Sequence, residues 1–213
     1  MTEKKYIAVI GDLVGSRQLP ERDKDQVRLN YFLVKVNSHF ADAIEAHFVN
    51  TIGDELQGLV KRNFQLQEFL QFFHQHFGWK IKTRFGVGLG SLTTAVRSEA
   101  IGLDGACFYY ARERFQRAKD QAKFLTFSNF EMNKALTALF DLVFQIESKW
   151  TKRQSEIIAL YREVGDQTAV ARQLQITKQS VFDTLKAAKY DLYSAGWQGI
   201  QQLFEFSSAD ESI

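Results

Sequence analysis

Two short segments near the start of the chain place carboxylates beside glycines. Asp12 follows the apolar run 7–10 and one glycine, and Asp54 and Glu55 follow a glycine between two strand-like segments. Magnesium prefers oxygen ligands, usually one or two carboxylates together with phosphate oxygens and water. Together with the Leu13 carbonyl, these side chains predict a site for Mg²⁺ or Mn²⁺ that carries the phosphates of a nucleotide.

The residues just after the first carboxylate add a candidate phosphate contact. Gly15, Ser16 and Arg17 offer backbone N–H groups and a guanidinium to an anion. A structural interpretation stays open for both motifs, because Gly-Asp pairs are common in hairpin turns and an Asp after a strand often fixes a loop. In that interpretation Glu55 points away from the site and serves only the strand.

A second candidate site lies near the C-terminus. The pattern there predicts three helices, at residues 151–163, 167–174 and 177–189. The spacing of Ala171, Ile176 and Val181 is that of a helix-turn-helix, and the segment resembles sigma-factor region 4 and LuxR-type DNA readers. Gln175 stands where such proteins usually have a glycine in the turn.

In this motif the third helix enters the major groove with its N-terminal residues at the base edges. The residues predicted to lie there are Thr177 as the helix cap, Lys178, Gln179, Ser180 and Asp183. The predicted phosphate contacts are Arg153, Arg172, Lys186 and Lys189. Residues 151–190 hold seven Lys and Arg against four Asp and Glu, a mild positive excess that suits double-stranded DNA. The alternative is a three-helix module that serves packing or dimerisation.

The elements that must position the carboxylates alternate in type. Strands are predicted at residues 5–14, 47–51, 55–61, 80–89 and 124–127, and helices at 23–44, 64–77, 104–119 and 129–148. The first six elements have the βαββαβ order of a ferredoxin-like unit. Right-handed crossovers would put the first strand in the centre of an antiparallel sheet, beside the hairpin. Both carboxylate motifs would then meet near one end of the central strands.

Several of these motifs resemble known families. The segments 10–15, 51–56 and 84–90 are similar to those of class III nucleotidyl cyclases and GGDEF diguanylate cyclases, and Ala111-Arg112 falls where cyclases carry an Ala-Arg helix motif. Ile-Gly-Asp-Leu-Val-Gly-Ser-Arg at 10–17 and Gly-Asp-Glu-Leu-Gln at 53–57 resemble the SatD family over nearly the whole chain. The cyclase resemblance implies a palm-like fold with metal at Asp12 and Asp54 and places Arg112 near phosphate.

The chain departs from the cyclase pattern at the positions that select the substrate. Ile52 stands where diguanylate cyclases have a second glycine, Phe108 stands in place of the helical Asn, and no lysine occurs in residues 48–51. We therefore weigh three hypotheses. The first, which we favour, is a DNA-binding regulator with a cyclase-like sensor domain. The second is a nucleotidyl cyclase or related phosphoryl transferase, and the third is a non-catalytic interaction module.

Composition limits the remaining choices. The 213 residues carry a net charge of +2 and a single cysteine, which fits a globular protein of the reducing cytoplasm. No signal peptide or membrane span is predicted. We expect an α+β ferredoxin-like domain at 1–128, a connecting helix at 129–150, an all-α helix-turn-helix domain at 151–206 and a tail at 207–213. Cyclases and helix-turn-helix DNA readers usually act as dimers, and the resemblance to both therefore predicts a homodimer.

Overall fold

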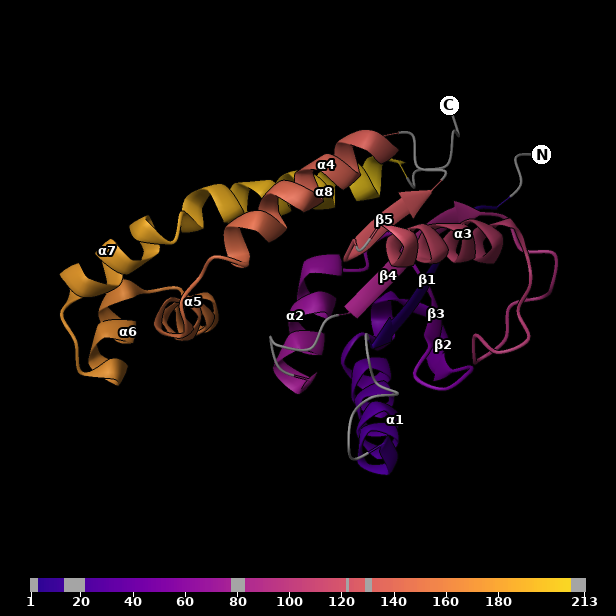
Figure 1. Ribbon diagram of the computed structural model, residues 1–213, viewed down its shortest axis with the longest axis horizontal. Coiled ribbons are helices and arrows are strands. Elements are labelled where there is room, and N and C mark those ends of the chain that lie inside the picture. Colours follow the sequence, from indigo (N-terminus) through magenta and orange to yellow (C-terminus); the bar gives the residue numbers. More distant parts are fainter. Residues whose placement is uncertain (1–3, 14–21, 78–82, 122, 129–131, 208–213) are drawn as a thin grey trace. The chain divides into compact units, whose positions relative to one another are not determined.

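The computed structural model describes residues 4–13, 22–77, 83–121, 123–128 and 132–207 (Figure 1). By packing, the chain divides into two compact units, residues 1–137 with 201–213 and residues 138–200. The predicted domain boundaries at 128, 150 and 206 follow motifs rather than packing, and they stay predictions. Among the described residues, no helix has the length and apolar character needed to cross a membrane.

The first unit is built on a five-stranded sheet. Its elements are β1 (Tyr6–Leu13), α1 (Arg22–His39), the 3-10 turn η2 (Ala41–Ala43), β2 (Ile44–Asn50), β3 (Leu56–Val60), α2 (Leu66–Phe77), β4 (Thr83–Gly90), α3 (Ala106–Asp120) and β5 (Leu125–Ser128). The strand order is β2-β3-β1-β4-β5. β1 is antiparallel to both β3 and β4, and β5 is parallel to β4. The α+β class and the central place of β1 are confirmed.

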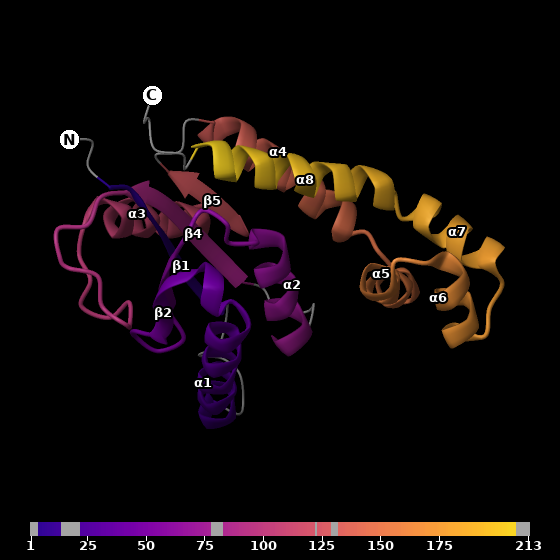
Figure 2. The same ribbon diagram turned by 180° about the vertical axis from the view of Figure 1, so that it is seen from behind.

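The two faces of this sheet are covered in different ways (Figures 1 and 2). On one face, phenylalanines of α1, α2, the strands and the connecting segments form an aromatic layer between the two helices and the sheet. Its buried members include Phe32, Phe40, Phe48, Phe64, Phe69, Phe73, Phe77 and Phe85. On the other face α3 packs directly on β4. A Cβ added at Gly88 would lie 2.3 Å from the backbone nitrogen of Ala111. The absence of a side chain at Gly88 therefore permits the backbones of β4 and α3 to be in contact.

The helix predicted at 23–44 is wrong at its C-terminal end. α1 ends at His39, and Ile44 already begins β2. Ile44 extends the three- and four-residue spacing of the helix, but its buried side chain belongs to the next element. The same spacing would place Val27 on the core face of the helix, but Val27 is 69% exposed and Leu29 is buried. Asn37 then joins α1 to β2, because its amide accepts from the Phe48 N–H at 2.7 Å and donates to the Phe48 carbonyl at 2.8 Å.

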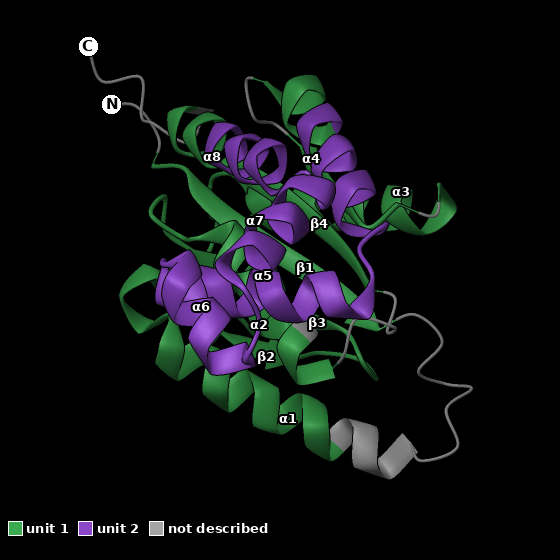
Figure 3. Ribbon diagram, turned by 90° about the vertical axis from the view of Figure 1, so that its left-hand side faces the viewer, with its two compact units in different colours: residues 1–137, 201–213 green, residues 138–200 purple. Residues whose placement is uncertain are grey.

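In its described part, the second unit is helical (Figure 3). It contains most of α4 (Asn133–Glu147), all of α5 (Lys152–Val164), α6 (Gln167–Leu174) and α7 (Lys178–Ala187), and the greater part of α8 (Tyr190–Ser207). Thr151 caps α5 with a capping box, and Gly165 ends it in the left-handed conformation at φ 74°. The three predicted helices therefore form with nearly the predicted bounds.

The turn between α6 and α7 takes a strained form. Gln175 has φ 53°, a left-handed conformation that usually falls to glycine. Thr177 then caps α7 by accepting from the Ser180 N–H at 3.0 Å. Beneath the turn, Val170, Ala171 and Val181 are buried with residues of α5 in one apolar cluster. Gln175 thus adopts the left-handed conformation that a glycine usually adopts at this position of the turn.

The close contact of α3 with β4 generates a test of the fold. Gly88→Ala forces a Cβ against the α3 backbone, so we expect it to lower the free energy of unfolding by at least about 2 kcal/mol. Gly199→Ala is a matched control, because its Cβ would meet only a Leu139 methyl at 3.8 Å. In a helix interior that change is neutral or stabilises by up to about 1 kcal/mol. Equal effects in urea unfolding would contradict the proposed packing.

Candidate functional site

The first two predicted carboxylates meet at one end of the central strands. Asp12 lies on the same face of β1 as Ala8 and Ile10, which pack in the apolar cluster under α3. Asp54 lies in the turn between β2 and β3. Because β3 pairs with β1, this turn comes to rest beside the end of β1. The Leu13 N–H donates to Asp54 Oδ2 at 3.2 Å, which ties the turn to the strand.

The hairpin turn holds Asp54 in place through its own hydrogen bonds. Gly53 adopts φ 66°, and the Thr51 N–H donates to the Glu55 carbonyl at 2.8 Å. The Asn50 side-chain amide closes the turn by donating to the Gly53 carbonyl at 2.7 Å. The hairpin signal in the sequence is therefore confirmed, and it aims one carboxylate at β1.

Asp12 is a buried carboxylate that is only half satisfied. The residue is 8% exposed. Its Oδ2 lies 3.2 Å from the Lys119 ammonium. Its Oδ1 is buried and has no hydrogen-bond partner among the residues that the structure describes. A buried oxygen without a donor is costly, and such an oxygen is a suitable ligand for a hard cation.

The charges around Asp12 oppose one another. Burial raises the pKa of Asp12 above its ordinary value, and the negative charge of Asp54 raises it further, whereas Lys119 and Arg84 lower it. Arg84 stands opposite Asp12 in the β1–β4 ladder. The net effect of the surroundings is to disfavour the ionised form, which a bound cation would reverse.

Glu55 and Arg112, predicted as metal and phosphate contacts, pair with each other. Arg112 Nη1 lies 2.5 Å from Glu55 Oε2, and the Thr51 hydroxyl donates to Glu55 Oε1 at 2.9 Å. The Glu55 side chain is only 13% exposed, whereas that of Arg112 is 48% exposed. In this state Glu55 holds Arg112 and the turn, and the predicted roles of both residues stay predictions.

The remaining predicted phosphate ligands cannot be placed, and the carboxylates form no larger cluster within the described residues. Gly15, Ser16 and Arg17 lie outside the described residues. Within the described ranges, no group of three or more His, Cys, Asp and Glu side chains is arranged to hold a metal ion. Two carboxylates with phosphate oxygens and water are, however, a usual Mg²⁺ set. The thiol of Cys107 is buried in the apolar cluster under α3, and this burial raises its pKa to about 12.

Sequence reasoning missed two cations of the site. Lys119 follows Arg112 by two helical turns, so the spacing already places both on one face of α3. That signal was available in the sequence. Arg84 gives no such signal, because only the register of β4 against β1 sets it opposite Asp12.

The residues predicted to contact DNA share one property, exposure to solvent. They are Arg153, Arg172, Thr177, Lys178, Gln179, Ser180, Asp183, Lys186 and Lys189. Gln179 donates to Asp183 at 2.9 Å along α7, and Arg153 lies 3.5 Å from Glu156 on α5. Contact with DNA is untested by this arrangement and stays a prediction.

The environment of Asp12 predicts a pH effect. The stabilising contribution of a group whose folded pKa is raised is complete below its ordinary value, 3.8 here, and is lost as the pH rises through the folded pKa. Asp12→Asn cannot ionise, so without metal it should melt above the wild type at pH 7, and the difference should shrink toward pH 4. Thermal unfolding at both pH values measures this.

The control for that experiment is Glu113→Gln on α3. Glu113 pairs with Arg117 at 3.0 Å, away from Asp12, and its removal should leave the difference between the two pH values as in the wild type. An Asp12→Asn protein that melts below the wild type at pH 7 would show that the ionised carboxylate is stabilising.

Comparisons with known proteins place the chain. No curated protein matches it. The solved structure of a bacterial light-regulated adenylyl cyclase aligns with a TM-score of 0.40 and 11% identity over 60% of this chain and 77% of that one, a similarity too low to support a conclusion about function. The SatD family matches residues 6–204, which span both units, and the chain therefore belongs to the SatD family.

Proposed function

We propose that the first unit binds a nucleotide or related phosphate compound through a divalent cation at Asp12 and Asp54, and that its chemistry is metal-dependent phosphoryl transfer. The observation that carries the proposal is Asp12 Oδ1, a buried carboxylate oxygen that lacks a donor among the described residues. The Gly-Asp motif of the hairpin turn supplies the second carboxylate at the same end of the sheet.

The donor set fits Mg²⁺ or Mn²⁺. Asp12 and Asp54 are hard oxygen ligands, and phosphate oxygens and water would complete the shell of the ion. A bound divalent cation would neutralise charge on the phosphates. Because Asp54 Oδ2 already accepts from the Leu13 N–H, the hairpin holds this carboxylate in place before any ligand arrives.

Lys119 and Arg112 supply positive charge on the adjoining face of α3. The ammonium of Lys119 balances Asp12 and, at 31% exposure of its side chain, is open to a phosphate as well. The planar guanidinium of Arg112 suits bidentate contact with a phosphate. Its ion pair with Glu55 holds the guanidinium near the carboxylates. These residues would bind and orient a phosphate chain beside the carboxylates.

Ligand binding can be measured by thermal unfolding with Mn²⁺ and each of the four ribonucleoside triphosphates. At 100 times its Kd, a ligand stabilises the folded state by about 2.7 kcal/mol. We expect a shift with at least one nucleotide that needs Mn²⁺ and is lost in Asp12→Asn and Asp54→Asn. Each shift is taken relative to the same protein without ligand, because Asp12→Asn changes the starting midpoint.

Glu113→Gln is again the matched control and should keep the full shift. Shifts that persist unchanged in both aspartate variants would refute the site. Pyrophosphate or phosphate release from the bound nucleotide then separates transfer from binding alone. Turnover that disappears in Asp54→Asn supports the transferase, whereas binding without turnover limits the first unit to a sensor.

A second proposal concerns α5 to α7, which we infer to be a DNA-binding helix-turn-helix. It is supported by the left-handed turn at Gln175 and by the exposed N-terminal residues of α7, which leave Lys178 and Gln179 open to a groove. Gln pairs well with adenine and Lys with guanine. The first unit would then be the ligand-binding partner of a transcription regulator.

The DNA proposal can be tested by selecting duplexes from a random-sequence pool and measuring fluorescence anisotropy on the enriched site. Lys178→Ala and Gln179→Ala should each weaken binding about tenfold or more, since one base contact contributes about 1–3 kcal/mol. Arg172→Ala should weaken binding to all DNA sequences alike, and it should reduce the slope of log affinity against log salt concentration by about one. Lys134→Ala, an exposed lysine of α4 outside the motif, is the control.

A further inference from the structure

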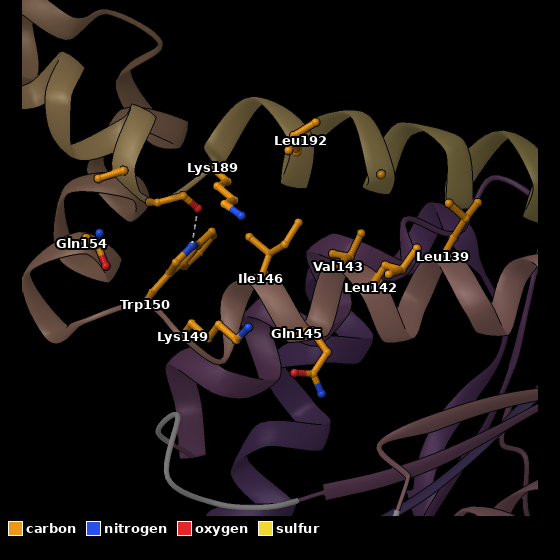
Figure 4. A pocket seen from close by; sticks show the side chains of 13 residues that line it. Leu139, Leu142, Val143, Gln145, Ile146, Lys149, Trp150, Gln154, Lys189 and Leu192 are labelled. Atoms are coloured by element: carbon orange, nitrogen blue, oxygen red, sulfur yellow. Dashed lines mark hydrogen bonds between the residues drawn. The ribbon is translucent and has the colours of Figure 1, made fainter.

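The second unit contains a pocket whose apolar walls neither proposed function uses. Its volume is about 470 Å³, within the range of about 300–1,000 Å³ that is usual for small-molecule sites. It lies between the C-terminal part of α4 and the N-terminal part of α8, and it ends at the junction of α7 and α8 (Figure 4).

The walls of the pocket are aliphatic. Leu139, Leu142 and Ile146 come from α4, and Leu192 faces them from α8 (Figure 4). Leu142 and Leu192 are each 63% exposed, which is unusual for leucines on helices that are otherwise packed. The two helices approach closely at Gly196, whose added Cβ would lie 2.4 Å from a Val143 methyl.

One end of the pocket is aromatic and positively charged. Trp150 lies there, and its indole N–H donates to the Ala188 carbonyl at 2.8 Å. Lys149 and Lys189 stand at the same end, one on the α4 side and one at the start of α8, with the leucines toward the other end (Figure 4). The pocket-lining residues include no acid. The pocket therefore joins an apolar channel to an unbalanced pair of cations.

Lys189 is also held in a strained conformation. Its φ is 55°, and among the described non-glycine residues only Gln175 shares a positive φ. The position ends α7, where glycine or asparagine is usual. Conformations of this kind persist where the surrounding structure fixes them, so the backbone of Lys189 has a defined position at this end of the pocket.

We propose that this pocket binds an amphiphilic organic anion, with an acyl or aryl body between the leucines and a carboxylate or similar head between Lys149 and Lys189. The separation of an apolar end from a cationic end argues for this class. A neutral apolar ligand would make no charge contact with Lys149 and Lys189, and a cationic ligand would be repelled. The inference rests on neither proposed function; it shares Lys189 with the predicted DNA surface, so its test contains no DNA.

The test is isothermal titration calorimetry of the full chain with decanoate, below its micelle concentration. We expect saturable binding of one decanoate per chain. Decyltrimethylammonium, which has the same chain and the opposite charge, should bind at least about tenfold more weakly, and decanol should fall between them. Leu142→Asp should remove decanoate binding without unfolding the protein, because Leu142 is exposed.

Two lysine variants test the cationic end. Lys189→Gly removes the ammonium and suits the positive φ, so it should fold at least as well as the wild type. Combined with Lys149→Gln, it should lower decanoate affinity about tenfold and make decanoate and decanol bind alike. Lys152→Gln, an exposed lysine of α5 outside the pocket lining, should change neither affinity.

Three outcomes would overturn the proposal. The first is equal binding of the anionic and cationic amphiphiles, or binding that the lysine and leucine variants leave unchanged. The second is stable attachment to phosphatidylglycerol vesicles without binding of free decanoate, which would make the surface a lipid contact. The third is a dimer that Leu142→Asp dissociates in a protein that binds no decanoate, which would make a second copy the occupant.

Discussion

The backbone contact of α3 with β4 is the constraint on which the first unit depends. The helix lies close enough that Gly88 has no room for a side chain against Ala111. A rigid helix held at that distance carries Arg112 and Lys119 to the end of β1, where their charges meet the carboxylates. The positions of the α3 cations relative to the carboxylates therefore depend on this close approach.

The burial of Asp12 is the observation that favours the proposed cation site over a purely structural turn. A turn needs Asp54 only to accept the Leu13 N–H, and that bond would form with or without a charge on β1. Asp12 is different, because burial disfavours its ionised form and one oxygen lacks a donor among the described residues. Groups of this kind reduce stability and cluster at functional sites, where the binding of a ligand offsets the lost free energy. This energetic conflict favours a cation site over a fixed loop.

In the second unit two residues in the left-handed conformation set the limits of α7. Gln175 lies in the turn before it and Lys189 follows its end, and each costs roughly 1 kcal/mol relative to glycine. Between them α7 presents an exposed polar surface, and beyond Lys189 the chain forms one wall of the apolar pocket. Both ends of the helix are thus defined by backbone conformation as well as by side-chain packing.

The sequence by itself determined the order of the elements, the hairpin at Gly53 and the short helices of residues 151–189, because local periodicity, caps and turn residues specify these. It also predicted that Asp12 and Asp54 would meet, since the βαββαβ order leaves few topologies. Only the tertiary structure placed Arg84 opposite Asp12 and paired Glu55 with Arg112, because strand register and helix docking join residues that are distant in the chain. The end of α1 at His39 was decided in the same way, since the apolar spacing continues unbroken into β2.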